Sequence, residues 1–230
     1  MSFFLIIGMH RSGTSCLAGS LERCGIYLGD VKKKGKYNKK GYFEIEEVYR
    51  IHDQILGLNR GTWKSPPTHK LRVHPYHFLR LKAIIEPLKL RQNSGLKDPR
   101  TLLFINTWKR LIGRDIQFIG SFRHPKAVAQ SLFYRNGMSE KESISLWKTY
   151  NQILVEEHQR QPFPIIHYDM SNTSKYKKDV IDISKQFNLK PQYFKLKWFI
   201  SSKLQHYHFE DYDLPLSCRD LYNYLMYHAL

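Results

Sequence analysis

The sequence has few cysteines and no long apolar run. Its three cysteines, Cys16, Cys24 and Cys218, form neither a Cys-x-x-Cys pair nor the cysteine–histidine spacing of a zinc site. An odd number of cysteines does not suit a disulfide scaffold, so we expect a reducing, cytoplasmic environment. No window approaches the roughly 18 apolar residues of a membrane-spanning helix, and the first residues lack the basic region and cleavage site of a signal peptide.

Acidic residues are also scarce. Only 20 aspartates and glutamates stand against 37 lysines and arginines, which gives a formal net charge of +17. This excess predicts anionic partners such as nucleotides, acidic glycans or lipid headgroups, and peripheral contact with a membrane stays open. No RNA- or DNA-recognition signature accompanies the charge, so a nucleic-acid partner is not expected. Six lysines fall in VKKKGKYNKK, residues 31–40, and form either a solvated loop or a patch that steers substrate.

The order of apolar segments predicts the fold class. With 42% hydrophobic residues, the chain is long enough for a single α/β domain over residues 1–230, with a parallel β-sheet flanked by helices. Strands are predicted at 3–7, 115–122 and 164–168, with another ending at Leu96 and Lys97. Helices are predicted from Gly13 to Gly25, from about Glu44 to Ile55, at 75–90, 102–112 and 126–134, from the Ser139–Glu142 capping box to about 159, and over much of the chain after 171.

The stretch GMHRSGTS, residues 8–15, follows the first predicted strand. Its spacing, G-x-x-x-x-G-x-S, is the frame of a phosphate-binding P-loop, in which backbone N–H groups converge on an anion before a helix N-terminus. A nucleotide triphosphatase would carry Lys where this chain has Thr14, and the cation lies at Arg11 instead. The motif therefore predicts an anion site and weakens the case for an ATPase. A glycine-rich turn without a ligand is the alternative.

A second anion site is predicted where the strand at 115–122 ends. Arg123 follows this strand at the edge where open α/β sheets bind ligands, and Ser131 lies about two helical turns further on. Alone, the pair could equally be an arginine that caps a helix and a serine on a solvated face. Together with the loop at 8–15, it fits a ligand with two separated anionic ends, such as 3′-phosphoadenosine 5′-phosphosulfate (PAPS).

On these residues the chain resembles the PAPS-dependent sulfotransferases, particularly bacterial proteins of that family. The resemblance rests on GMHRSGTS (8–15), NKKGYFE (38–44), LKDPR (96–100) and FRHPKAVAQSL (122–132), with weaker likeness at SEKESISLWKTY, HYD, SSKLQHYH, DLP and LYNYL. It implies a P-loop NTPase-like sulfotransferase fold and an enzyme that transfers a sulfuryl group from PAPS to a hydroxyl or amine, releasing adenosine 3′,5′-bisphosphate. The RKGxxG element of cytosolic eukaryotic members is missing, so the adenine contacts stay unassigned.

The resemblance also implies a role for each matching residue. The 5′-phosphosulfate would be held by Arg11, Ser12, Gly13, Thr14 and Ser15, the 3′-phosphate by Arg123 and Ser131, and the acceptor cleft would be lined by Lys97, Asp98 and Arg100. Asp98 could orient Arg11 or Arg100. Arg11 and the loop amides would neutralise the leaving group, so no metal is required.

The general base is expected to be Glu44, which ends NKKGYFE near a predicted helix start. His10, beside Arg11, is the rival catalytic candidate, and His52 is a third. In the alternative interpretation Glu44 only favours the helix dipole.

The acceptor is left open between a glycan, a lipid and a small-molecule alcohol. Two other functions also stay open. A P-loop small-molecule kinase would use Asp169, which follows the strand at 164–168, as its Walker B acid. A basic nucleic-acid-binding protein would lack catalysis altogether. A sulfotransferase fold that has lost its activity is a further alternative.

Overall fold

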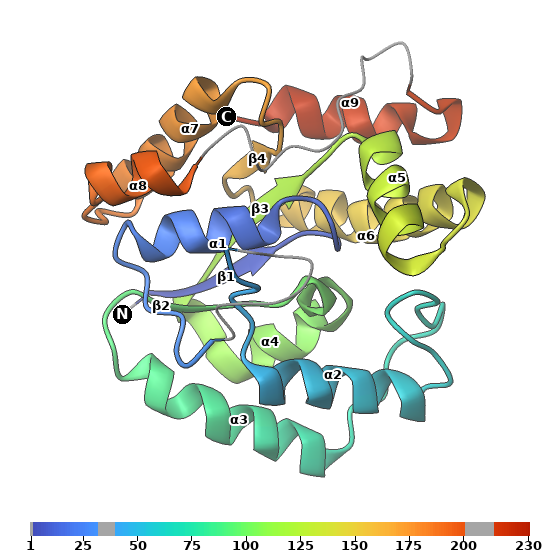
Figure 1. The fold of residues 1–230 in the computed structure, drawn as a ribbon. Coiled ribbons are helices and arrows are strands. Elements are labelled where there is room, and N and C mark those ends of the chain that lie inside the picture. The colour runs from blue at the N-terminus through green and yellow to red at the C-terminus, as the bar shows by residue number, and fades with distance from the viewer. Residues whose placement is uncertain (1, 32–39, 201–213) are drawn as a thin grey trace.

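A computed structural model describes residues 2–31, 40–200 and 214–230. The lysine-rich stretch 32–39 and the SSKLQHYH motif lie outside them. Helices cover both faces of one sheet (Figure 1). Its strands are β1 (Phe3–Ile7), β2 (Ser94–Lys97), β3 (Ile116–Phe122) and β4 (Ile165–His167). All pairings are parallel, in the order β2-β1-β3-β4, which confirms the predicted α/β class with a parallel sheet.

The helices lie close to their predicted positions. They are α1 (Thr14–Glu22), α2 (Glu46–Leu58), α3 (Pro75–Lys89), α4 (Ile105–Ile112), α5 (Pro125–Asn136), α6 (Glu140–Arg160), α7 (Thr173–Gln186), α8 (Tyr193–Phe199) and α9 (Arg219–His228). The predicted capping box begins α6, since Ser139 Oγ accepts from the backbone N–H of Glu142, whose carboxylate accepts from the N–H of Ser139. Pro125 begins α5, as expected.

One predicted helix end is confirmed, and one predicted helix start is shifted by two residues. Helix α1 (Thr14–Glu22) is closed at Gly25, as expected: Gly25 has a φ of +103°, its N–H donates to the backbone oxygen of Glu22, and the N–H of Ile26 donates to that of Leu21. Helix α2 begins at Glu46, so Glu44 lies two residues before it in an extended segment. Glu46 and Glu47 occupy the first turn of α2, where acidic side chains meet the helix dipole. Glu44 therefore does not serve that helix end.

The sheet is buried on both faces, which is why its strands read as continuous apolar runs. On one face, Phe3, Leu5 and Ile7 of β1 pack with residues of α2 to α6 and α9. On the other, Phe4 and Ile6 pack with residues of α1, α7 and α8 (Figure 1). Parallel strands end at the same edge, so the segments that follow β1, β2 and β3 are brought together there.

Two further observations concern the whole of the described chain. None of its helices combines the length and the apolar content needed to cross a bilayer. The three cysteines are buried and form no disulfide.

Candidate functional site

The loop between β1 and α1 is shaped by two glycines. Gly8 and Gly13 have φ angles of +153° and +81°. A Cβ on Gly8 would lie 2.2 Å from the carbonyl oxygen of Ser121, and one on Gly13 would lie 2.1 Å from Cγ of Tyr168. Any larger residue would therefore clash with the neighbouring segments. Helix α1 begins after Gly13 without a side-chain N-cap, so no capping side chain occupies the N–H groups of its first turn, the groups that an anion site uses.

Arg11 lies within this loop and reaches α5. Its Nε donates a hydrogen bond to Ser131 Oγ at 2.7 Å. Burial, together with the like charges of Arg135 and Arg123, lowers the pKa of Arg11 to about 10. No carboxylate in the described part of the chain forms an ion pair with Arg11. Three guanidinium groups thus share one neighbourhood at the ends of β1 and β3, an arrangement that an anion would stabilise.

The two predicted anion sites are therefore adjacent. Ser131 was paired in the sequence with Arg123, but in the structure its hydroxyl accepts from Arg11. Arg123 itself follows β3 and is buried, with its guanidinium carbon 5.3 Å from the centroid of the Tyr168 ring. Its backbone oxygen accepts a hydrogen bond of 2.9 Å from Trp147 Nε1, which fixes the turn out of β3. Arg11 and Arg123 face one site rather than opposite sides of the molecule.

The hydroxyl groups of the loop have different environments. Ser12 is fully buried, and its Oγ has no hydrogen-bond partner among the described residues. Thr14 is also buried. Ser15 Oγ donates to the backbone oxygen of Tyr42 at 3.2 Å, which joins the start of α1 to the segment that carries Glu44. Buried hydroxyls usually have a partner, so Ser12 leaves one hydrogen-bonding position of the loop unfilled.

Glu44 is held at the same edge by Lys97. Lys97 ends β2 beside Ile6 of β1, is only 1% exposed, and donates from Nζ to Glu44 Oε1 at 2.5 Å. The other carboxylate oxygen of Glu44 has no partner among the described residues. Because Lys97 fixes one oxygen, it orients the second, so Glu44 is a positioned carboxylate and Lys97 is its support.

Asp98 accepts hydrogen bonds from two other candidate residues, His52 and Arg100. One oxygen accepts from His52 Nδ1 at 2.7 Å, and the other accepts from Arg100 Nη1 at 2.9 Å. Burial alone would raise the pKa of Asp98, but Arg100 and His52 together hold it well below its usual range. Asp98 is fully buried, so it orients Arg100, one of the two arginines considered for it, instead of facing an acceptor.

His52 has no ring nitrogen left for catalysis. Its Nδ1 donates to Asp98, and its Nε2 accepts from Trp108 Nε1 at 3.3 Å. The ring is fully buried and stacks on Phe104 with 4.4 Å between centroids. His52 is therefore a core residue that helps to hold Asp98.

His10 is the stronger histidine candidate. Its ring stacks on Trp63 with 4.1 Å between centroids, and its Nε2 is buried with no hydrogen-bond partner in the described chain. Burial lowers the pKa of His10 well below 6.5, and the charges of Arg100 and Lys97 lower it further. No described residue holds the His10 ring by a hydrogen bond, whereas Lys97 holds the carboxylate of Glu44.

Asp98→Asn should destabilise the fold at neutral pH by about 3 kcal/mol, because it leaves buried cationic Arg100 without its carboxylate. A depressed pKa means that the stabilisation is complete above the unfolded-state value, about 3.9, and is lost as the pH falls below it. Urea unfolding at pH 7 and at successively lower pH should show the gap between variant and wild type shrinking with acid. The control, Asp53→Asn, removes the exposed partner of Arg100 and should cost less than about 1 kcal/mol. A gap that does not change with pH would contradict the ionised pair.

Three residues of this site were missed from the sequence. Arg135 lies four residues after Ser131 on α5, so the i,i+4 spacing could have placed it on the same face. Tyr168 belongs to the HYD motif, but nothing in that motif indicates that its ring packs on Gly13. Trp63 lies in the loop between α2 and α3, and no local pattern indicates its contact with His10.

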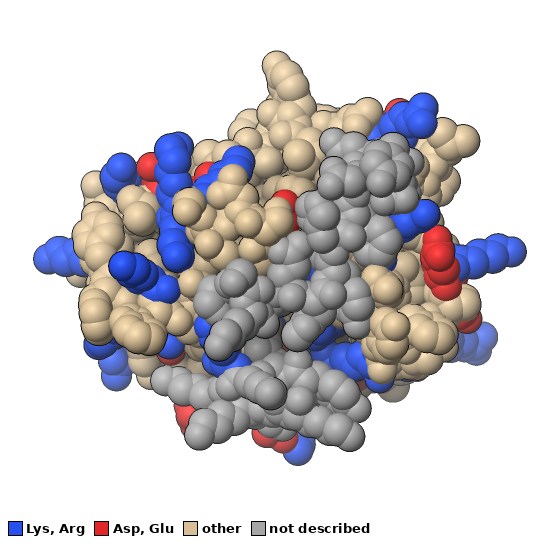
Figure 2. All heavy atoms as spheres, turned by 45° about the horizontal axis from the view of Figure 1, so that its top comes forward, with Lys and Arg blue, Asp and Glu red and all other residues tan. Residues whose placement is uncertain are grey.

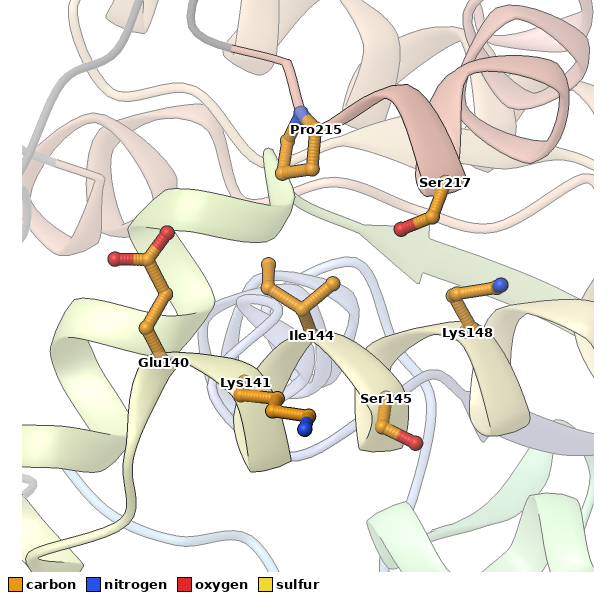
Figure 3. A pocket seen from close by; sticks show the side chains of 7 residues that line it. All are labelled: Glu140, Lys141, Ile144, Ser145, Lys148, Pro215 and Ser217. Carbon is orange, nitrogen blue, oxygen red and sulfur yellow. The ribbon is translucent and has the colours of Figure 1, made fainter.

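An open cavity of about 490 Å³ lies elsewhere, between the start of α6 and the segment before α9 (Figure 3). Its lining residues are Glu140, Lys141, Ile144, Ser145, Lys148, Pro215 and Ser217. Figure 3 shows Ile144 directed toward Pro215, with acidic and basic side chains on the same helix. This mixed lining does not match a ligand with several negative charges, and none of the loop residues contributes to it.

Comparison with known proteins adds no relative to this picture. No protein-family model matches the chain, and no curated protein matches it in sequence. The site is therefore interpreted from its own geometry and chemistry.

Proposed function

We propose that the chain is a sulfotransferase that transfers a sulfuryl group from PAPS to a hydroxyl or amine of an acceptor. The observation that carries the proposal is the meeting of Arg11, Ser131 and Arg123 at the end of β1 and β3. They surround a loop that has the form of a phosphate site. The fold that we propose is accordingly the P-loop-like fold of sulfotransferases, a finer assignment than the parallel α/β sheet itself.

The residues present fit such a donor. The Oγ of Ser12 is buried without a partner among the described residues, and the first turn of α1 has no side-chain cap. Burial and, after it, the charges of Arg135 and Arg123 lower the pKa of Arg11, so an anion between these arginines would offset their mutual repulsion. When bound, PAPS would supply the sulfuryl group and a good leaving group, adenosine 3′,5′-bisphosphate.

The remaining steps of the reaction would be carried out by residues of the chain itself. In an in-line displacement, the sulfur–oxygen bond to the leaving phosphate breaks as the bond to the acceptor oxygen forms. The free oxygen of Glu44 would take the acceptor proton, with Lys97 holding the carboxylate in place. Arg11 and the amides of the loop would balance the charge that develops on the leaving phosphate. Arg123 would hold the 3′-phosphate.

The kinase alternative fits less well. A Walker B acid is expected at the end of a strand beside β1, where Arg123 follows β3 and Asp98 follows β2. Asp98 is buried, and its two oxygens accept from His52 and Arg100. Asp169 follows β4 at the far edge of the sheet and accepts hydrogen bonds from the backbone and hydroxyl of Ser171. Thr14 stands where a kinase has its lysine, and the acid nearest the loop strand is engaged by His52 and Arg100.

A thermal-shift comparison tests the proposal. Adenosine 3′,5′-bisphosphate at about 100 times its Kd should raise Tm by roughly 5–10 °C, while ATP at the same concentration should raise it far less. Radiolabelled PAPS offered with alcohols, sugars and lipids should then give a labelled product. A larger shift with ATP, or equal shifts with both nucleotides, would favour the kinase. A shift with the bisphosphate but no labelled product from any acceptor class would leave a binding protein and overturn the enzymatic proposal.

A further inference from the structure

Helix α8 exposes an unusual group of aromatic side chains. Tyr193, Phe194 and Trp198 are 60%, 74% and 73% exposed. The rings of Phe194 and Trp198 contact each other, with 6.1 Å between their centroids. Aromatic residues of this size are costly to leave in water, and a cluster of them on one short helix marks a surface that binds something.

The helix is anchored by other residues. Leu196 and Phe199 are buried, and Phe199 lies against Gly19 of α1 and edge-on to Phe43. The guanidinium group of Arg23 stacks on the ring of Phe199, and the distance from its carbon to the ring centroid is 3.9 Å. The exposed aromatics are therefore not needed to attach α8 to the rest of the molecule.

Lysines surround the aromatic cluster. Lys190, Lys195 and Lys197 are exposed, and none of them forms an ion pair with a described residue. The sequence from 183 to 200 contains no acidic residue. Figure 2 shows several Lys and Arg side chains on the side of the molecule where α7 and α8 lie, with few acidic side chains beside them. The surface formed by Lys190, Tyr193, Phe194, Lys195, Lys197 and Trp198, called here the α8 face, thus combines positive charge with large apolar rings.

We propose that the α8 face docks the protein on the surface of a membrane that contains anionic lipids. Aromatic rings settle at the boundary between headgroups and acyl chains, while lysines beside them attract anionic headgroups. A second copy of the chain is a poorer occupant, because a symmetric contact would set these lysines against one another. Such docking holds whichever reaction the chain catalyses.

Vesicle co-sedimentation with the full chain tests this. The wild type should bind vesicles of phosphatidylcholine with one third phosphatidylserine and should not bind phosphatidylcholine alone. Lys195→Glu with Lys197→Glu should lower the partition coefficient by more than about 30-fold, the effect of losing two basic charges, because each change also adds an acidic one. Phe194→Ala with Trp198→Ala should lower it by about 10-fold or more through lost apolar contact. In the wild type, brominated phosphatidylcholine in the same vesicles should quench tryptophan emission more than it does in Trp198→Phe.

Matched variants separate the α8 face from charge in general. Lys70→Glu with Lys82→Glu makes the same change in net charge at exposed sites elsewhere, and Tyr227→Ala removes another exposed aromatic ring, 85% exposed on α9. Both should bind vesicles nearly as the wild type does. Equal loss in the two lysine pairs would overturn the proposal, as would unchanged binding after the aromatic replacements. Failure of the wild type to bind anionic vesicles would also overturn it and would point to an acidic protein partner instead.

Discussion

Glu44→Gln is expected to lower the rate of sulfuryl transfer by roughly 100-fold or more, the usual contribution of a general base. Its affinity for adenosine 3′,5′-bisphosphate should stay nearly unchanged. Lys97 fixes one oxygen of Glu44 at 2.5 Å and leaves the other without a described partner. Glutamine keeps the shape of the side chain but cannot take the acceptor proton at neutral pH. The change should therefore affect turnover far more than donor binding.

The measurement is turnover at saturating PAPS and acceptor, with calorimetry of the bisphosphate as the test that the site is intact. Glu47→Gln is the matched control, because Glu47 lies on α2, pairs with Arg80 at the surface and should leave turnover unchanged. Wild-type turnover in Glu44→Gln would remove Glu44 from the role of base. A loss of bisphosphate affinity equal to the loss of rate would show instead that the carboxylate supports the loop.

Most of the fold was predictable because its signals are local. The apolar run at 3–7 is a strand, and the Ser139–Glu142 capping box begins a helix, because each pattern lies within a few residues of the element that it specifies. The start of α2 was misplaced because Glu44 and Ile45 continue the apolar-polar pattern of the helix that follows. The strand order depends on contacts between distant segments, and no local pattern gave it.

The candidate site was predictable in its residues but not in its contacts. Arg11 and Ser131 are separated by 120 residues and meet only because β1 and β3 pair in parallel. Lys97 was expected to face the acceptor, but it lies buried against Glu44. A motif shows which residue types are present at the end of a strand. The sheet decides which of them touch.

Arg123→Ala is expected to weaken adenosine 3′,5′-bisphosphate binding by about 100-fold, the range of a lost charge-assisted hydrogen bond to phosphate. Alanine keeps the backbone oxygen that accepts from Trp147, so the turn after β3 should persist. Calorimetry gives the Kd, and the sharpest control is the ligand itself. Adenosine 5′-phosphate lacks the 3′-phosphate, so its weaker affinity should not change in this variant. Arg110→Ala, on an exposed part of α4, should leave both affinities as they are.

A Ser131→Ala variant tests whether this serine acts with Arg123 or with Arg11. If Ser131 acts with Arg123 on the 3′-phosphate, Ser131→Ala should weaken only the bisphosphate, and its effect should nearly vanish in the Arg123→Ala background. If it acts chiefly through its 2.7 Å bond to Arg11, the loss should extend to adenosine 5′-phosphate and should vanish in the Arg11→Ala background instead. Because both arginines face one site, we expect the effect of Ser131→Ala to be coupled to Arg123→Ala and to Arg11→Ala. An unchanged bisphosphate Kd in Arg123→Ala would refute the 3′-phosphate assignment, whatever the serine does.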